Sequence, residues 1–272
     1  GTEEDLDWLG VAHAIKVRQS DIISLYDAAR DRLIAAGRLY PAYETEDELE
    51  IKRGRARLLG KPPIYDRAAL ALTDAQKRAY EAEGRTPHWR FRLDGRAVHY
   101  DDLIKGPQTI NTDSMSDPVL IRGDGTYLYT LCSVVDDIDL GITHVIRGED
   151  HVSNTGTQIE IFEALGGAVP LFAHHNLLTG AEGEGLSKRL GSLSLAELRN
   201  DGFEALAVAL VAVLTGTSLP VEPYPDLDTV AQKLDLPMIS HGPARFDPAE
   251  LESLNARILH AMPYDVARPR LP

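Results

Sequence analysis

The sequence predicts an α/β protein in which a doubly wound parallel sheet is interrupted by a small α+β insertion and followed by an all-helical unit. Three observations support this prediction. From Pro118 onward, short apolar runs alternate with helix-like spacing, which is typical of parallel strands joined by crossover helices. Residues 41–117 have a mixed and partly basic character. After residue 191 the chain becomes rich in Ala and Leu, with helical periodicity.

Before Pro118 the pattern predicts a helix and a strand pair. We expect Ser20 to cap the start of the helix and Gly37 its end, and the apolar residues between them fall near one face: Ile22, Ile23, Tyr26, Leu33 and Ile34. Residues 88–103 alternate between apolar and polar types around a turn at Asp94-Gly95. We expect them to form a hairpin within the insertion.

Between residues 118 and 178 the pattern predicts three strands and two helices. The strands cover 118–122, 142–148 and 171–178, and the helices cover 127–138 and 153–165. Right-handed crossovers would make the strands parallel. Ligands bind beyond the carboxyl ends of such strands. The loops 147–151 and 179–192 are therefore expected to face one crevice. Farther on, Asp247 and Pro248 predict the start of a last helix.

Composition excludes several classes of protein. The 272 residues carry 42 acidic and 28 basic side chains, for a net charge of −14. Such a surface repels polyanions, so a nucleic-acid partner would need a local basic patch. The single cysteine, Cys132, permits neither an internal disulfide nor a cysteine-rich zinc site. No apolar run reaches the roughly 20 residues of a membrane helix. We expect a cytoplasmic protein without a membrane partner.

Two loops at the predicted strand ends carry candidate chemistry. Residues 185–189, Gly-Leu-Ser-Lys-Arg, offer N–H groups, a hydroxyl and two cations that suit phosphate oxygens. The alternative is a solvated Lys-Arg turn. Residues 147–151, Arg-Gly-Glu-Asp-His, include Arg147, which is suited to hold a carboxylate, and Glu149 or Asp150, which suit ribose hydroxyls or an amine. The alternative is a surface cluster of ion pairs.

Three further groups of polar residues have competing interpretations. Asp136 and Asp137 suggest a magnesium site, but consecutive helical residues point about 100° apart, which favours a solvated helix end. His174 and His175 point to opposite faces of a strand, so at most one faces the crevice. The run 51–61 holds five cations and no acid, which suits either a phosphate backbone or a solvated basic helix: Lys52, Arg53, Arg55, Arg57 and Lys61.

Taken together and in this order, these segments resemble bacterial glutamyl-tRNA synthetases, which are class I enzymes. Residues 127–155 and 177–199 are similar to the family's catalytic core, residues 38–50 and 62–70 to its connective insertion, and residues 243–260 to its stem-contact region. The resemblance implies a Rossmann-like fold with four parts. These are the remainder of the first Rossmann half (1–40), the insertion that binds the acceptor arm (41–117), the second half with the signature loop (118–190) and a helical stem-contact domain (191–272).

The resemblance also implies a two-step reaction. Glutamate attacks ATP to give glutamyl-adenylate, and the acyl group then passes to the 3′ end of tRNA. Lys188 matches the family's lysine that neutralises the ATP phosphates in the transition state, and it is the implied catalytic residue. Gly185 replaces another lysine of the signature loop, which leaves more of the electrostatic load on Lys188. The implied ligands are tRNA, L-glutamate and ATP with magnesium, and we expect a monomer.

The residues that the resemblance implies fall into three groups. ATP would contact Asp150, Leu178, Gly185, Leu186, Ser187, Lys188 and Arg189. Glutamate would be held by Tyr129 and Arg147, in a pocket also lined by Thr130, Leu131, Cys132 and Ser133. The tRNA would contact the five cations of the run 51–61.

The sequence departs from the family pattern in two ways. Some relatives bind zinc through cysteines of the insertion, but Ala42 stands in that neighbourhood here, so we expect no zinc and no other bound metal site. The family's His-Ile-Gly-His nucleotide motif does not occur in the 272 residues. We therefore expect a middle piece of the ligase. The alternatives are a truncated, non-catalytic tRNA-binding fragment and a paralogue that glutamylates a modified tRNA base.

Overall fold

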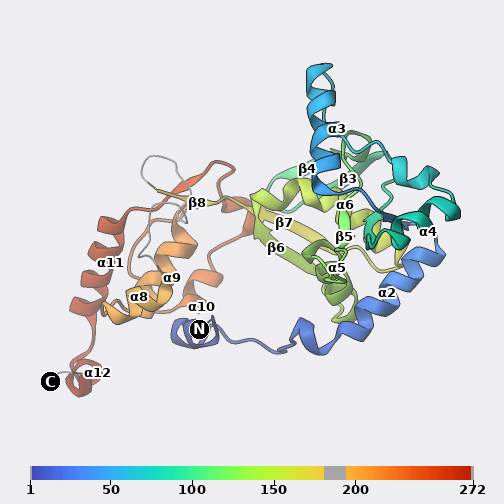
Figure 1. Ribbon diagram of the computed structural model, residues 1–272. Coiled ribbons are helices and arrows are strands. Elements are labelled where there is room, and N and C mark those ends of the chain that lie inside the picture. The colour runs from blue at the N-terminus through green and yellow to red at the C-terminus, as the bar shows by residue number, and fades with distance from the viewer. Residues whose placement is uncertain (1, 181–193, 271–272) are drawn as a thin grey trace.

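A computed structural model describes residues 2–180 and 194–270. In this part of the chain the strands form three separate sheets (Figure 1). The strands are β1 (Leu39–Ala42), β2 (His88–Phe91), β3 (Ala97–Asp102), β4 (Gly106–Asn111), β5 (Val119–Ile121), β6 (His144–Gly148), β7 (Leu171–His175), β8 (Leu178–Thr179) and β9 (Ala244–Arg245). The helices are α1 (Thr2–Leu9), α2 (Ile23–Ala35), α3 (Glu46–Leu58), α4 (Asp74–Ala82), α5 (Tyr129–Asp139), α6 (Val152–Ala164), α8 (Leu195–Asn200), α9 (Ala205–Leu214), α10 (Leu227–Ala231), α11 (Pro248–Ala261) and α12 (Tyr264–Ala267).

The central sheet has four strands in the order β4-β3-β7-β6. β6 and β7 are parallel and paired over five residues each, from His144 opposite Leu171 to Gly148 opposite His175. β3 runs parallel to β7, and β4 is its antiparallel neighbour, because a connection of three residues can join strands only in that sense. Helix α6 packs on β3 and β4, and α5 packs on α6. The α/β fold class is confirmed, with an antiparallel edge strand.

Two predicted strand pairings are wrong. Residues 118–122 contain β5, but β5 pairs with β2 in a separate antiparallel sheet of order β1-β2-β5. Residues 88–103 contain β2 and β3, which lie in different sheets, so no hairpin closes across Asp94-Gly95. Alternating polarity predicts a half-buried strand, but the choice of partner depends on packing between segments that are distant in sequence.

Local capping explains where several helices begin. Helices α3, α4 and α8 start with capping boxes, in which a hydroxyl side chain and the residue three positions later satisfy each other's backbone N–H groups. Asp247 caps α11 ahead of Pro248, as predicted. Helix α2 begins at Ile23 without a side-chain cap, so the predicted cap at Ser20 is wrong. Gly37 follows the helix with φ +65°, a conformation that favours glycine.

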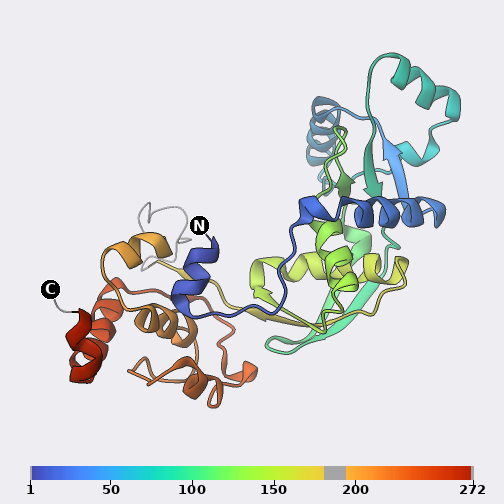
Figure 2. The same cartoon turned by 90° about the horizontal axis from the view of Figure 1, so that it is seen from below.

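Two large hydrophobic cores lie in two units of the molecule. The first fills the space around α2, α5, α6 and the two larger sheets, and includes Leu33, Phe91, Leu120, Leu131, Ile161 and Phe162. The second lies among α8, α9, α10 and α11, and Trp8 of α1 packs against it. We call α1 and residues 194–270 the helical unit. Figures 1 and 2 show residues 10–22 running from this unit to α2.

The helical unit is not wholly helical. Its short strand β9 pairs with β8, with Leu178 opposite Ala244 and Thr179 opposite Arg245. Backbone hydrogen bonds between β8 and β9 therefore connect the helical unit to the end of the sheet region. The division at residues 40, 117 and 190 stays a prediction. None of the helices in the described part of the chain has the length and apolar character needed to cross a membrane.

Candidate functional site

Arg147 lies near the carboxyl end of β6, where the sequence pattern places a ligand crevice. Its Nη2 donates to Gln158 Oε1 at 2.7 Å and to Thr155 Oγ1 at 2.8 Å. Both acceptors belong to α6, one turn apart. Its Nε donates to His174 Nε2 of β7 at 3.1 Å. The guanidinium is therefore held from two sides, by the helix that covers the sheet and by the neighbouring strand.

The side-chain partners of Arg147 include no carboxylate. In residues 2–180 and 194–270 its guanidinium contacts hydroxyl, amide and imidazole groups, and its Nη1 lies 3.5 Å from the hydroxyl of Tyr129. Tyr129 is 53% exposed at the start of α5, and its ring centroid lies 5.5 Å from that of His151. A guanidinium that is fixed in this way and forms no ion pair with the described carboxylates is suited to bind an anion, above all a carboxylate.

Asp150 and the segment before β8 meet at Gly148. A Cβ atom at Gly148 would lie 2.6 Å from Asp150 Oδ1 and 2.9 Å from Leu177 Cδ2, so a larger residue there would displace these two side chains. Asp150 is exposed, and Leu178 is half-buried in β8. Glu149 instead forms an ion pair with Lys105 at 2.6 Å. The two acids of the loop after β6 therefore differ: Glu149 is paired with Lys105, whereas Asp150 is exposed.

The other predicted site residues lie in several environments. Leu131 and Cys132 are buried in the first core, and burial raises the pKa of the Cys132 thiol to about 11. Thr130 and Ser133 are half-buried, and Ser133 Oγ accepts a hydrogen bond from Gln158 Nε2 at 2.9 Å. The predicted ATP residues of the signature loop lie outside the described residues: Gly185, Leu186, Ser187, Lys188 and Arg189. The roles assigned to all these residues stay predictions.

Sequence reasoning missed the residues that hold Arg147. Thr155 and Gln158 are polar residues three positions apart in α6, within the stretch 155–162 in which every residue is buried. Such a pair on the covered face is a signal for a polar contact with the sheet. His174 is fully buried and faces Arg147, whereas the ring of His175 contacts the backbone oxygen of Asn176.

The pair Asp136 and Asp137 is not a solvated helix end. Asp136 accepts hydrogen bonds from Tyr26 at 2.7 Å and from Gln19 at 2.8 Å, which joins α5 to α2 and the residues before it. Asp137 is half-buried, and desolvation together with the charge of Asp136 raises its pKa to about 6. In the described residues no three acidic, histidine or cysteine side chains gather as a metal site.

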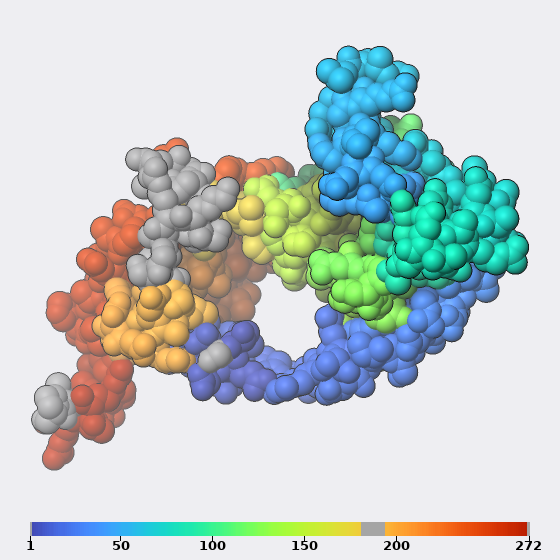
Figure 3. Space-filling model, in the orientation of Figure 1, coloured from blue at the N-terminus to red at the C-terminus, as the bar shows by residue number. Residues whose placement is uncertain are grey.

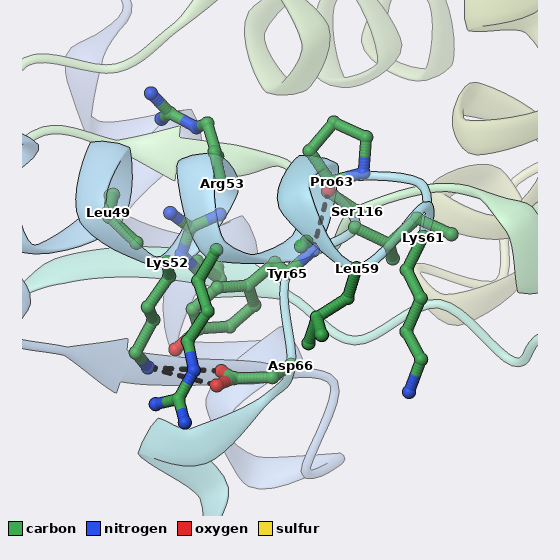
Figure 4. A pocket seen from close by; sticks show the side chains of 13 residues that line it. Leu49, Lys52, Arg53, Leu59, Lys61, Pro63, Tyr65, Asp66 and Ser116 are labelled. Carbon is green, nitrogen blue, oxygen red and sulfur yellow. Dashed lines mark hydrogen bonds and ion pairs between the residues drawn. The ribbon is translucent and has the colours of Figure 1, made fainter.

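A second candidate site lies along α3, which stands out from the rest of the surface in Figure 3. A groove of about 550 Å³ runs between α3 and the segment that follows it. Figure 4 shows Lys52 of this groove against Asp66, with Nζ 3.1 Å from Oδ2. Tyr65 forms part of the floor, where the Arg90 guanidinium lies 4.0 Å from its ring centroid.

The cations of α3 are only partly neutralised. Arg53 pairs with Glu46 and Glu50, and Arg57 also pairs with Glu50. Glu46 and Glu50 lie just before the run 51–61. Counting charges only within the run therefore gives too high a number of unpaired cations. Arg55 and Lys61 line the groove, are exposed, and form no ion pair within the described chain. In Figure 4 the side chain of Lys61 extends away from its neighbours.

Comparisons with known proteins agree on one family. A family model described as "tRNA synthetases class I (E and Q), catalytic domain" matches residues 2–253. The chain is 64% identical over 268 residues to "Glutamate--tRNA ligase 2" of Methylobacterium sp. (strain 4-46), covering 98% of this chain and 60% of that protein. It is 54% identical over 272 residues to "Glutamate--tRNA ligase 1" of Maricaulis maris, covering 100% of this chain and 61% of that protein.

A solved structure shows the same fold. It is the crystal structure of a glutamate tRNA ligase from Elizabethkingia meningosepticum in complex with its amino acid, with a TM-score of 0.83 and 24% identity. The similarity covers 98% of this chain and 60% of that chain. The chain thus spans about 60% of the length of the relatives it matches.

Proposed function

The chain belongs to the family of class I tRNA synthetase (E and Q) catalytic domains, and from this premise we propose that it carries the glutamate site of a glutamate–tRNA ligase. The proposed reaction is the ATP-dependent activation of L-glutamate to glutamyl-adenylate, followed by transfer to the 3′ end of tRNA. The names of relatives up to 64% identical support this proposal. We also propose that the protein works in the cytoplasm and as a monomer.

The single observation that carries the proposal is the guanidinium of Arg147. It is held by Thr155, Gln158 and His174, has no carboxylate partner in the described chain, and lies beside the exposed Tyr129. A substrate carboxylate at this point would supply the missing counter-ion and accept hydrogen bonds from the guanidinium and from the Tyr129 hydroxyl. Glutamate has two carboxylates, so one can bind to Arg147 while the other reacts with ATP.

ATP is the proposed second substrate. The accessible carboxylate of Asp150 and the nearby segment 177–178 lie where the adenosine part would be expected, beyond the ends of parallel strands. Lys188 is the proposed catalytic residue, because a cation next to the triphosphate stabilises the charge that develops as pyrophosphate leaves. Magnesium would accompany the phosphates. We assign it no protein ligand, since no acidic cluster in the described chain fits one.

A tRNA is the proposed acceptor, and α3 is the observation that favours its contact. Arg55 and Lys61 are exposed, without ion-pair partners in the described chain, and border a groove on a protruding helix. Such cations are suited to phosphate groups. The same surface also supports a second candidate function, in which the chain binds tRNA without activating glutamate. Glutamate-dependent exchange of pyrophosphate into ATP separates the two, because only the ligase performs it.

The test of the glutamate site is the substitution Arg147→Ala in the intact protein that contains this chain. Removing one partner of a desolvated ion pair leaves the other uncompensated, so we expect glutamate binding to weaken by about 2–4 kcal/mol. Titration calorimetry with L-glutamate measures this. Arg78→Ala is the matched control, because it removes the same charge from an exposed position on α4. Unchanged glutamate affinity in Arg147→Ala would refute the proposed site.

A further inference from the structure

Three side chains form a line of hydrogen bonds across adjacent strands of the central sheet. Asp102 ends β3, His174 lies in β7 and Arg147 lies in β6. Asp102 Oδ2 is 2.5 Å from His174 Nδ1, and His174 Nε2 is 3.1 Å from Arg147 Nε. The side chains of Asp102 and His174 are 0% exposed. This line joins the interior of the sheet to the guanidinium at the crevice.

The protonation states along the line follow from its geometry. Arg147 has donors only, so His174 Nε2 must be the acceptor in their hydrogen bond. The proton of the neutral ring is then on Nδ1, which donates to the carboxylate of Asp102. Asp102 Oδ1 is occupied separately, by the backbone N–H groups of Ile104, Lys105 and His174 at 2.9–3.1 Å. Both hydrogen bonds of His174 therefore require the tautomer with the proton on Nδ1.

The pKa directions agree with this arrangement. Burial opposes ionisation of Asp102, but the hydrogen bonds from Lys105, His174 and Ile104 hold the pKa of its carboxyl below the usual range. Burial lowers the pKa of His174, and the charge of Arg147 adds to this effect, while Asp102 opposes it. The ring thus stays neutral and keeps Nε2 as an acceptor at neutral pH.

We propose that Asp102 and His174 are positioning residues that orient the guanidinium of Arg147 for the substrate carboxylate, an inference that rests on the proposed glutamate site. Thr155 and Gln158 hold Nη2, and His174 holds Nε, which leaves Nη1 directed toward Tyr129. Neither Asp102 nor His174 is exposed, so neither touches the substrate. They act through Arg147 and through Thr155, whose Oγ1 lies 3.2 Å from His174 Nε2 and accepts a hydrogen bond from Arg147.

Asp102→Asn is the decisive variant because it is nearly isosteric. An Asn oxygen still accepts from the three backbone N–H groups, but its NH₂ group then faces His174 Nδ1. The ring must shift its proton to Nε2, where an N–H points at the guanidinium of Arg147. We expect the KM for glutamate to rise about tenfold to a hundredfold, by analogy with the loss of hydrogen bonds that orient metal ligands, with the KM for ATP unchanged.

Three further variants distinguish positioning from a general loss of structure. His174→Gln offers an N–H to Asp102 and an oxygen to Arg147, so we expect it to retain more glutamate affinity than His174→Leu, which offers neither. Asp101→Asn is the matched control, because it removes the same charge from an exposed residue of the same strand. Pyrophosphate exchange at varied glutamate and ATP, with circular dichroism as the fold check, supplies the readout. A folded Asp102→Asn enzyme with unchanged KM for glutamate would overturn the inference.

Nitrogen NMR of protein labelled at His and Arg gives a readout that does not depend on activity. We expect His174 to show the Nδ1–H tautomer and a scalar coupling between its Nε2 and Arg147 Nε, both lost in Asp102→Asn. The Nε2–H tautomer in the wild-type protein would overturn the inference even if a variant failed to fold. Absence of glutamate-dependent exchange in the wild-type protein with tRNA present would refute the proposed function instead, and the NMR signals would still decide whether Asp102 and His174 orient Arg147.

Discussion

At the scale of single residues, burial decides what a charged group does in this protein. Arg147 and Asp137 are both half-buried and lie in adjacent elements of the fold. Hydrogen bonds to neutral groups satisfy Arg147 and keep it oriented. The structure describes no hydrogen bond to the Asp137 carboxyl, and desolvation raises its pKa to about 6. The proposed role of the first residue is to bind the substrate carboxylate, whereas the second lowers the stability of the fold at neutral pH.

Asp137→Asn is expected to stabilise the protein at pH 7. A folded-state pKa above the ordinary value of 3.8 means that the protonated form is favoured by folding. Its contribution is complete below about pH 4 and is lost as the pH rises through 6. Two pKa units correspond to about 3 kcal/mol, and partial exposure reduces this, so we expect a gain of about 1 kcal/mol at pH 7 and none at pH 4.

Denaturant unfolding of Asp137→Asn at pH 4 and pH 7 measures this difference. Asp139→Asn is the control, because Asp139 is exposed in the same helix turn and its loss should change the free energy of unfolding by less than about 0.5 kcal/mol. Equal effects of the two variants at both pH values would show that Asp137 ionises as freely as a surface residue.

At the scale of elements, α3 and the segment after it hold cations of two kinds: those that form ion pairs within the helix and those that form none within the described residues. Arg53 and Arg57 share Glu50, at spacings of three and seven residues, and these ion pairs hold the exposed face of the helix together. Arg55 and Lys61 lie toward the groove, without ion pairs in the described chain. The protruding helix therefore presents fewer unpaired cations than its sequence suggests. Those that remain, Arg55 and Lys61, line the groove.

The double variant Arg55→Ala/Lys61→Ala is expected to weaken tRNA binding and to reduce its salt dependence. Each lost phosphate contact should lower the slope of log affinity against log salt by about 1. Arg57→Ala is the matched control and should have a smaller effect, because Arg57 is already paired with Glu50. Filter binding at several salt concentrations gives both slopes. An unchanged slope in the double variant would remove α3 from the proposed tRNA surface.

At the scale of the whole molecule, two cores are joined by a small number of contacts. His241 of the helical unit lies 2.8 Å from the Ile104 backbone oxygen, and Asn176 donates to the backbone oxygen of Gly242 at 2.9 Å. The pairing of β8 with β9 adds two register pairs, and residues 10–22 connect α1 of the helical unit to α2. Each core has its own set of buried side chains, and the first is the larger.

We expect the two units to unfold in separate transitions, with the helical unit first. The chain has two tryptophans, Trp8 against the second core and Trp89 against the first. In Trp89→Phe the remaining fluorescence reports the helical unit, and in Trp8→Phe it reports the sheet region. We expect the transition of Trp89→Phe at lower urea concentration, because the smaller core stabilises its unit less. Coincident transitions in the two variants would show a single cooperative unit.

Side-chain pattern alone was sufficient to predict most elements and the position of Arg147. Apolar periodicity predicts α2 and α5, since each buries one face regardless of which partner covers it. The helix predicted over 153–165 is also present, as α6, although all of its residues 155–162 are buried. Parallel strands end at the same edge of a sheet, so the segment after β6 could be predicted to carry a site. The resemblance of residues 127–155 and 177–199 to glutamyl-tRNA synthetases added the family, which the comparisons confirm.

The sequence by itself therefore determined the local elements, the fold class and the family, because these depend on residue type and spacing. The tertiary structure alone decided strand partners and the groups that hold Arg147. β2 and β5 pair across a gap of 27 residues, and Asp102 meets His174 over 72. Such contacts follow from how whole elements pack, and no spacing within a single segment encodes them. The same physical reason explains why the buried state of Asp137 became visible only in three dimensions.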